Sequence, residues 1–152
     1  MKKTVIIFIV LSIVTLGLAV ESFAQRGPMK WKGSGGWGQG TPYNRMYDPA
    51  KVETISGTVE SVGTAVPMKG MYAATTLTVK TDKETISVHL GPEWYIGRLD
   101  TKIAKGDAIE VKGSRVTFAE KPAIIAAEVK KGDNVLVLRD SAGTPVWSGW
   151  RR

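Results

Sequence analysis

Apolar side chains recur at every second position between Val52 and Val129, and this alternation constrains the fold more than any other feature of the chain. Valine, isoleucine and threonine occupy most of these positions, and glycine-containing turns separate the alternating runs. A period of two is typical of strands that bury one face, because successive side chains of a strand point to opposite sides. The sequence therefore predicts a β-sheet domain rather than a helical one.

The alternation predicts five strands and one short helix in this region. The first strand starts at Val52, and its alternation changes phase at Glu60 and Ser61, which predicts a bulge or bend. From Gly91 to Leu99 the period changes, and Pro92 stands near a first helical position, which predicts a short helix. Four further strands are expected at residues 71–80, 84–90, 109–118 and 123–129.

Three strands, a short helix and two more strands follow the order of the OB-fold, a five-stranded, partly open Greek-key barrel. An immunoglobulin-like sandwich would need about seven strands and has no place for the helix. We therefore expect an all-β fold class, a five-stranded OB-fold-like barrel with one short helix between strands 3 and 4. Residues 135–138 and 145–147, on either side of a turn at 140–143, predict an appended C-terminal hairpin.

The first 24 residues have the composition of a cleaved secretory signal. Lys2 and Lys3 precede an apolar run, and small residues stand at the positions that a signal peptidase reads before a cut after Ala24. A retained anchor is the alternative, but the run is shorter than the roughly 20 residues that a membrane span needs. We expect a periplasmic or secreted protein of a Gram-negative envelope, without a stable membrane span after cleavage.

The remaining chain divides into three segments by composition. Residues 25–50 are rich in glycine and carry aromatic and basic side chains without any apolar period, which predicts a flexible arm. The OB-fold domain is expected over residues 51–131, and an appended hairpin with a basic tail over residues 132–152. The net charge is +3 for residues 25–50, +1 for 51–140 and +2 for the last two residues, so the basic excess lies in the tails.

The inventory of reactive side chains argues against catalysis. The chain has no cysteine and one histidine, which excludes disulfides, thiol catalysis, haem attachment through cysteine and cysteine-based metal sites. Nucleophile-elbow, P-loop and H-E-x-x-H motifs are absent, and the glycine-rich arm neither follows a strand nor opens a helix. We therefore predict a protein that is not an enzyme.

Aromatic and basic side chains are the candidate ligand contacts, because rings stack on bases or sugars and cations attract a charged polymer. The alternatives are that the aromatic side chains of the arm fold back onto the domain and that the C-terminal tryptophans plug an open barrel edge. A protein partner added along an edge is equally compatible. The expected ligand-binding residues are Trp31, Trp37, Tyr72, Lys80, Lys83, Trp147, Trp150 and Arg151.

A second constellation has the ligand types of a soft metal site. Met68 and Met71 flank the expected loop between the first two strands, and His89 and Trp94 lie where the third strand ends. Thioethers and an imidazole suit Cu(I), and an aromatic ring can cover the ion. The alternative is that Met71 belongs to the core, that Met68 covers the barrel mouth and that His89 points outward.

The segment from Val52 to Val129, with GDAIEVKGSRV as its fourth strand, resembles small exported OB-fold proteins of Gram-negative bacteria, including the bacterial OB-fold stress-tolerance family. Its Met, His and Trp are similar in ligand type to OB-fold copper- and silver-binding efflux proteins. The resemblance implies a non-enzymatic binding module for an anionic polymer, nucleic-acid-like or glycan, or for an envelope protein. The alternative that it implies is periplasmic Cu(I) or Ag(I) binding.

Overall fold

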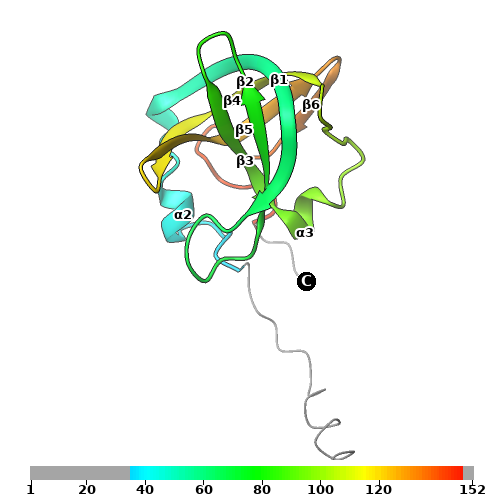
Figure 1. Cartoon of the computed structure of the whole chain (residues 1–152). Coiled ribbons are helices and arrows are strands. Elements are labelled where there is room, and N and C mark those ends of the chain that lie inside the picture. Colours follow the sequence, from blue (N-terminus) through cyan, green and yellow to red (C-terminus); the bar gives the residue numbers. More distant parts are fainter. Residues whose placement is uncertain (1–34, 149–152) are drawn as a thin grey trace, which may run out of the picture. The chain divides into compact units, whose positions relative to one another are not determined.

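The computed structural model describes residues 35–148, which lie within one compact unit, Gly33–Arg152. This part of the chain is mostly β, with six strands in one sheet and few helices (Figure 1). In chain order the elements are α2 (Pro42–Arg45), the 3-10 helix η1 (Pro49–Lys51), β1 (Val52–Ala65), β2 (Ala74–Lys80), β3 (Thr85–Pro92), α3 (Glu93–Ile96), β4 (Ala108–Phe118), β5 (Lys121–Lys131) and β6 (Asn134–Val137).

The strands follow the order β3-β2-β1-β4-β5-β6, and neighbours in this order are antiparallel. One additional pairing joins β3 and β5 in parallel, where Ser87 to His89 lie opposite Ala123 to Ile125. The predicted mostly-β fold class is confirmed, but the strand count of five is wrong. The sixth strand, β6, pairs with β5 along its whole length and so belongs to the sheet.

The C-terminal hairpin differs from its expectation because its returning half is not a strand. Only one isolated bridge, between Arg139 and Pro145, connects the two sides. Pro145 has no N–H to donate to a ladder. Before it, the side chain of Asp140 accepts hydrogen bonds from the backbone N–H groups of Ala142 and Thr144, both at 2.9 Å, which curls the chain into a tight turn.

The first strand is bent where its sequence changes phase. Its register with β2 shifts between Val59 and Ser61, as predicted from the alternation. The second strand begins three residues later than predicted. Before Ala74, the backbone N–H of Tyr72 donates to the carbonyl of Gly35 at 3.0 Å, so the chain pairs there with the N-terminal segment instead of β1.

The segment before β1 folds onto the sheet. Thr41 caps α2 by accepting a hydrogen bond from the N–H of Asn44, and Pro42 occupies a first helical position. Trp37, Tyr43 and Tyr47 are all buried in the core. The expectation of a flexible arm is therefore corrected for residues 35–50. The alternative, that the aromatic side chains of the arm fold back onto the domain, holds for Trp37, Tyr43 and Tyr47. Residues 25–34 lie outside the described part of the chain.

A buried arginine connects the two ends of the described chain. Arg139, which follows β6, is 3% exposed, and its guanidinium carbon lies 5.2 Å from the ring centre of Trp147, 5.6 Å from Tyr47 and 6.0 Å from Tyr43. Its Nη1 donates to the side-chain oxygen of Asn44 and to a backbone carbonyl, that of Gly143, at 3.1 Å. We call Trp37, Tyr43, Tyr47, Arg139 and Trp147 the aromatic–arginine cluster.

Two indole hydrogen bonds complete this cluster. Trp147 Nε1 donates to the carbonyl of Trp37 at 2.7 Å, and Trp37 Nε1 donates to the carbonyl of Tyr72 at 2.9 Å. Trp147 also lies close against β3, because a Cβ built on Gly91 would come within 2.9 Å of its ring. The cluster therefore holds the segments before β1 and after β6 against the sheet. Within residues 35–148, no helix is long and apolar enough to cross a membrane.

We predict that Arg139→Ala lowers the free energy of unfolding by about 3 kcal/mol, because it removes three ring contacts and two hydrogen bonds and leaves a cavity. Urea unfolding followed by tryptophan fluorescence measures this change. Arg98→Ala, at an exposed position, is the matched control and should stay within about 0.5 kcal/mol of the unsubstituted protein. Equal stability of the two variants would contradict a stabilising role for the cluster.

Candidate functional site

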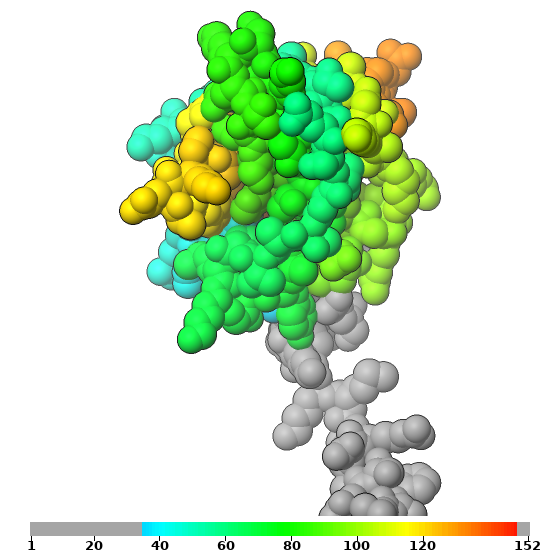
Figure 2. All heavy atoms as spheres, viewed as in Figure 1, coloured from blue at the N-terminus to red at the C-terminus, as the bar shows by residue number. Residues whose placement is uncertain are grey.

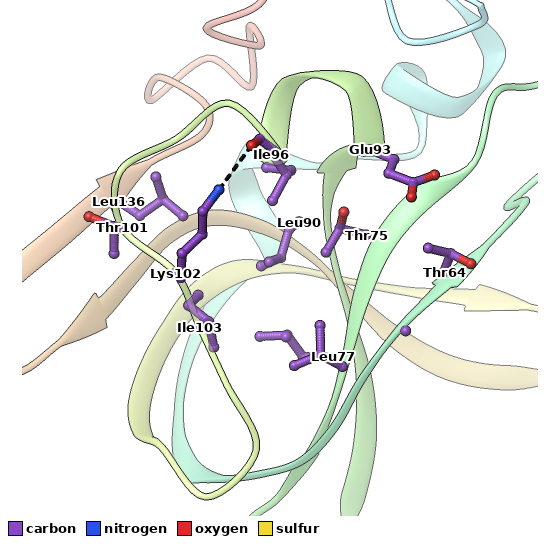
Figure 3. A pocket seen from close by; sticks show the side chains of 13 residues that line it. Thr64, Thr75, Leu77, Leu90, Glu93, Ile96, Thr101, Lys102, Ile103 and Leu136 are labelled. Carbon is purple, nitrogen blue, oxygen red and sulfur yellow. Dashed lines mark hydrogen bonds between the residues drawn. The ribbon is translucent and has the colours of Figure 1, made fainter.

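A cavity of about 340 Å³ lies between the second half of β1 and the segment that joins α3 to β4 (Figure 3). Its volume falls in the range of roughly 300 to 1,000 Å³ that is typical of ligand pockets. Large apolar side chains form its interior: Leu77, Leu90, Ile96, Ile103 and Leu136. Five lining residues carry hydroxyl or charged groups: Thr64, Thr75, Glu93, Thr101 and Lys102; Val62, Gly63 and Gly97 complete the lining.

The cavity exists because β1 loses a neighbour halfway along its length. The β1–β4 pairing ends at Thr58 and Ala108. Val59 extends the contact by one step: its N–H donates to the carbonyl of Asp107 at 2.9 Å, and its carbonyl accepts from the N–H of Gly106 at 2.8 Å. From the bulge onward, β1 follows β2 and leaves the α3–β4 segment, and the space between them is the cavity.

The α3–β4 segment is held in place by a network around Asp107. Its carboxylate accepts a hydrogen bond from the backbone N–H of Ala104 at 2.7 Å and pairs with Lys131 Nζ at 2.9 Å. The contact with Lys131 and the bond from Ala104 lower the pKa of the Asp107 carboxyl below its usual range. Lys131 Nζ also donates to the carbonyl of Lys102 at 2.9 Å, so this wall of the cavity is tied to β5.

The β1 wall of the cavity presents a free strand edge. Residues 61–65 pair with β2 on one side, and no other described strand pairs with them on the other. Val62, on this edge, is 44% exposed although it is apolar. An unpaired edge presents N–H and C=O groups that another extended chain can use.

Two opposite charges stand at the cavity. Lys102 Nζ donates a hydrogen bond to the carbonyl of Gly97 at 2.9 Å, so one N–H group of this ammonium is engaged within the cavity wall (Figure 3). Glu93 is exposed, and no ion pair is seen for its carboxylate within residues 35–148. An apolar interior with a charged and hydroxylic margin is typical of a ligand-binding cavity.

His89 occupies a different place from the one expected for a metal ligand. It is 6% exposed, its ring stacks on Phe118 with centroids 4.9 Å apart, and its Nδ1 lies 3.3 Å from the hydroxyl oxygen of Tyr43. Burial lowers the pKa of His89 to about 4, so the imidazole is neutral near pH 7. His89 is therefore a core residue packed against aromatic rings, and the expectation that it points outward is corrected.

The other candidate metal ligands also pack as apolar side chains. Met68, Met71 and Trp94 are partly buried against the core. Met71 lies against the N-terminal segment, because a Cβ built on Gly36 would come within 2.7 Å of its Cγ. Within residues 35–148, no group of three or more His, Asp or Glu side chains could hold a metal ion.

The expected polymer contacts are not brought together. Trp37 and Trp147 are buried and pack on each other, with ring centroids 6.1 Å apart, so neither ring is available for stacking on a ligand. Tyr72 is half-buried and accepts the indole hydrogen bond of Trp37. Lys80 and Lys83 are exposed at the β2–β3 turn, where no aromatic ring accompanies them among the described residues. Trp31, Trp150 and Arg151 lie outside the described residues.

Sequence reasoning missed the cavity and its margin. Leu77 and Leu90 lie within two of the expected strands, but Glu93 and Lys102 carried no signal in a region expected to be helix and loop. A free edge cannot be read from an alternating pattern, because a strand with one neighbour and a strand with two can have the same alternation.

The sheet and the cavity lie in a region that matches a known protein family. A sequence model described as the MamS/MamX magnetosome protein family matches residues 51–136, which is more than half of the chain. The matched region runs from the end of η1 into β6 and therefore contains the sheet and every residue that lines the cavity. A comparison with curated protein sequences finds no match.

This match corrects the family expected from the sequence. The assignments to the OB-fold stress-tolerance family and to the OB-fold copper and silver efflux proteins are wrong. The functions derived from them, an OB-fold module for nucleic-acid-like or glycan polymers or for an envelope protein, and alternatively Cu(I) or Ag(I) binding, are corrected with them. The geometry agrees with the correction, because Trp37, Trp147 and His89 are buried in the core.

We predict that acid destabilises the protein through His89. Between its ordinary pKa of 6.5 and the folded value of about 4, the unfolded chain binds a proton that the folded chain excludes, so the free energy of unfolding falls as the pH is lowered. The loss is up to about 3 kcal/mol over this window. Urea unfolding at a series of pH values measures it.

His89→Gln is the control for this prediction, because the chain has no other histidine. The slope between pH 6.5 and about pH 5 should disappear in this variant. The carboxyls of Glu84 and Asp107 have pKa values that Arg115 and Lys131 lower, so they begin to cost stability only as the pH falls toward their ordinary pKa values of 4.5 and 3.8. An unchanged slope in His89→Gln would show that another group is responsible.

Proposed function

The chain belongs to the MamS/MamX magnetosome protein family, and we propose on this premise that it is a magnetosome-associated protein that works by binding rather than by catalysis. The observation that carries the proposal is the family match over residues 51–136. That region holds the six-stranded sheet and the cavity beside β1, so the described binding geometry lies within the part of the chain that the family shares.

The absence of catalysis is part of the proposal and is supported by the available side chains. The chain has no cysteine, and its single histidine is buried against the ring of Phe118 and is neutral near pH 7. The acid–base groups at the cavity are Glu93 and Lys102, and the nucleophiles there are threonine hydroxyls. Within residues 35–148, neither Glu93 nor Lys102 hydrogen-bonds to one of these hydroxyls, as a base that activates a nucleophile would.

Two further statements belong to the proposal. The protein is exported, which is supported by the signal-like composition of residues 1–24. The five strands β1 to β5 close into a barrel, which is supported by the sequence of pairings from β3 through β2, β1, β4 and β5 back to β3.

We predict that the protein accompanies isolated magnetosomes. A tagged copy made in a magnetosome-forming bacterium should be recovered with the magnetically captured fraction, and an immunoblot of the captured and unbound fractions measures this. The same tag on an unrelated exported protein should remain in the unbound fraction. Recovery of the tagged chain only in the unbound fraction would contradict the proposed association.

We predict that the exported protein begins at Gln25. Signal peptidase requires a small residue directly before its cut, so Ala24→Arg should leave a larger, uncleaved precursor. Intact-mass measurement of the protein from the cell envelope distinguishes the two forms. Gln25→Ser leaves the small residues before the cut in place and should be processed as usual, and a precursor-sized product without any substitution would refute cleavage.

A further inference from the structure

The free edge of β1 and the cavity form one continuous feature of the surface. Beyond Val59 the edge of β1 has no neighbour among the described strands, and Val62, Gly63 and Thr64 of this edge also line the cavity. In the space-filling view, β1 lies at the surface, with the yellow-green residues of the α3–β4 segment beside it (Figure 2). An extended chain laid along this edge would therefore lie over the cavity.

The cavity is placed to receive side chains from such an extended chain. Val62 lies opposite Leu77 and Thr64 lies opposite Thr75 in the β1–β2 ladder, and all four line the cavity. They form one face of the sheet at its open edge. A strand added next to β1 would present every second side chain to this same face. Apolar side chains at alternate positions would therefore enter the cavity, between the sheet and Ile103.

The charges at the cavity favour a basic neighbour for those apolar side chains. Glu93 is exposed and without an ion pair within the described residues, whereas the ammonium group of Lys102 already donates to the carbonyl of Gly97. A neutral carbonyl does not cancel the charge of Lys102, so the cavity margin carries one charge of each sign. In Figure 3, Glu93 lies on the side of Thr64 and Thr75, and Lys102 lies on the other side beside Thr101. Glu93 is therefore the charge on the β1 side of the cavity, where it would attract a lysine or arginine of a chain bound along β1.

We propose that an extended segment of a partner protein, with apolar residues at alternate positions next to a lysine or arginine, binds by adding a strand to residues 61–65 of β1. Its backbone continues the sheet at the edge where the β1–β4 ladder stops, and its apolar side chains fill the cavity. Glu93 pairs with its basic residue. This inference goes beyond magnetosome association, because it names a binding surface on the purified protein and is tested without magnetosomes.

A selection from random heptapeptides displayed on phage tests the proposal. The bait is the full protein, in the form in which its host cell produces it. The expected result is enrichment of sequences with apolar residues at alternate positions and a lysine or arginine next to them. A synthetic peptide of the enriched sequence should bind one to one by calorimetry. It should also slow hydrogen exchange of backbone amides within residues 61–65, which a side-chain contact alone would not do. No enrichment, or enrichment without this protection, would overturn the proposal.

Substitutions locate the binding surface. Val62→Lys places a charge on the cavity edge and should raise the Kd of the selected peptide by at least about tenfold. Val135→Lys is the matched control, because Val135 is a similarly exposed valine on β6 that does not line the cavity, and it should leave the Kd unchanged. Equal effects of the two variants would place binding elsewhere and overturn the proposal.

Two further measurements test the chemistry of the occupant. Glu93→Gln should weaken the binding of the selected peptide. It should not weaken the binding of a peptide whose basic residue is replaced by glutamine. Dodecanoic acid is the alternative probe, because an acyl chain could also fill an apolar cavity. Saturable binding of dodecanoic acid that is lost in Val62→Lys, together with no peptide binding, would assign the cavity to a lipid and reject the peptide.

Discussion

The described structure depends on a buried cation that has no carboxylate partner. Arg139 is almost fully buried, and within residues 35–148 no acidic side chain forms an ion pair with it. Burying an unpaired charge is costly, so the surroundings of Arg139 must replace its water. Aromatic faces and two oxygen acceptors do this, although its Nε has no hydrogen-bond partner. Because the rings come from before β1 and after β6, the cation connects segments that are distant in sequence.

The two halves of β1 pair with different strands. Residues 52–58 pair with β4 and residues 58–65 pair with β2, so Thr58 is the position at which the neighbour changes. The bulge between Val59 and Ser61 then separates β1 from the α3–β4 segment. Since the β2 ladder continues past the bulge after the β4 ladder has ended, the strand remains ordered while its other edge is free. The cavity is therefore a consequence of the bend and needs no special residue to create it.

The sequence predicted what depends on neighbouring residues and missed what depends on distant ones. The alternating pattern located the strands and the bulge at Glu60, because both are properties of a continuous stretch. It missed the ordering of residues 35–50, because a glycine-rich segment without a period becomes ordered only through rings docked on a distant arginine. It misplaced His89 for the same reason, since the face on which a side chain lies does not reveal whether Tyr43 and Phe118 cover that face.

The boundaries of the family match separate stability from binding. Residues 51–136 contain the cavity and the free edge of β1, whereas every member of the aromatic–arginine cluster lies outside them. His89 lies inside the matched region, yet its hydrogen-bonding partner Tyr43 lies outside it. If the shared region carries the shared function, that function acts at the cavity and the free edge of β1, and the flanking segments act by packing against the sheet. A substitution in the cluster should then change the amount of folded protein, and one at the β1 edge should change what the folded protein binds.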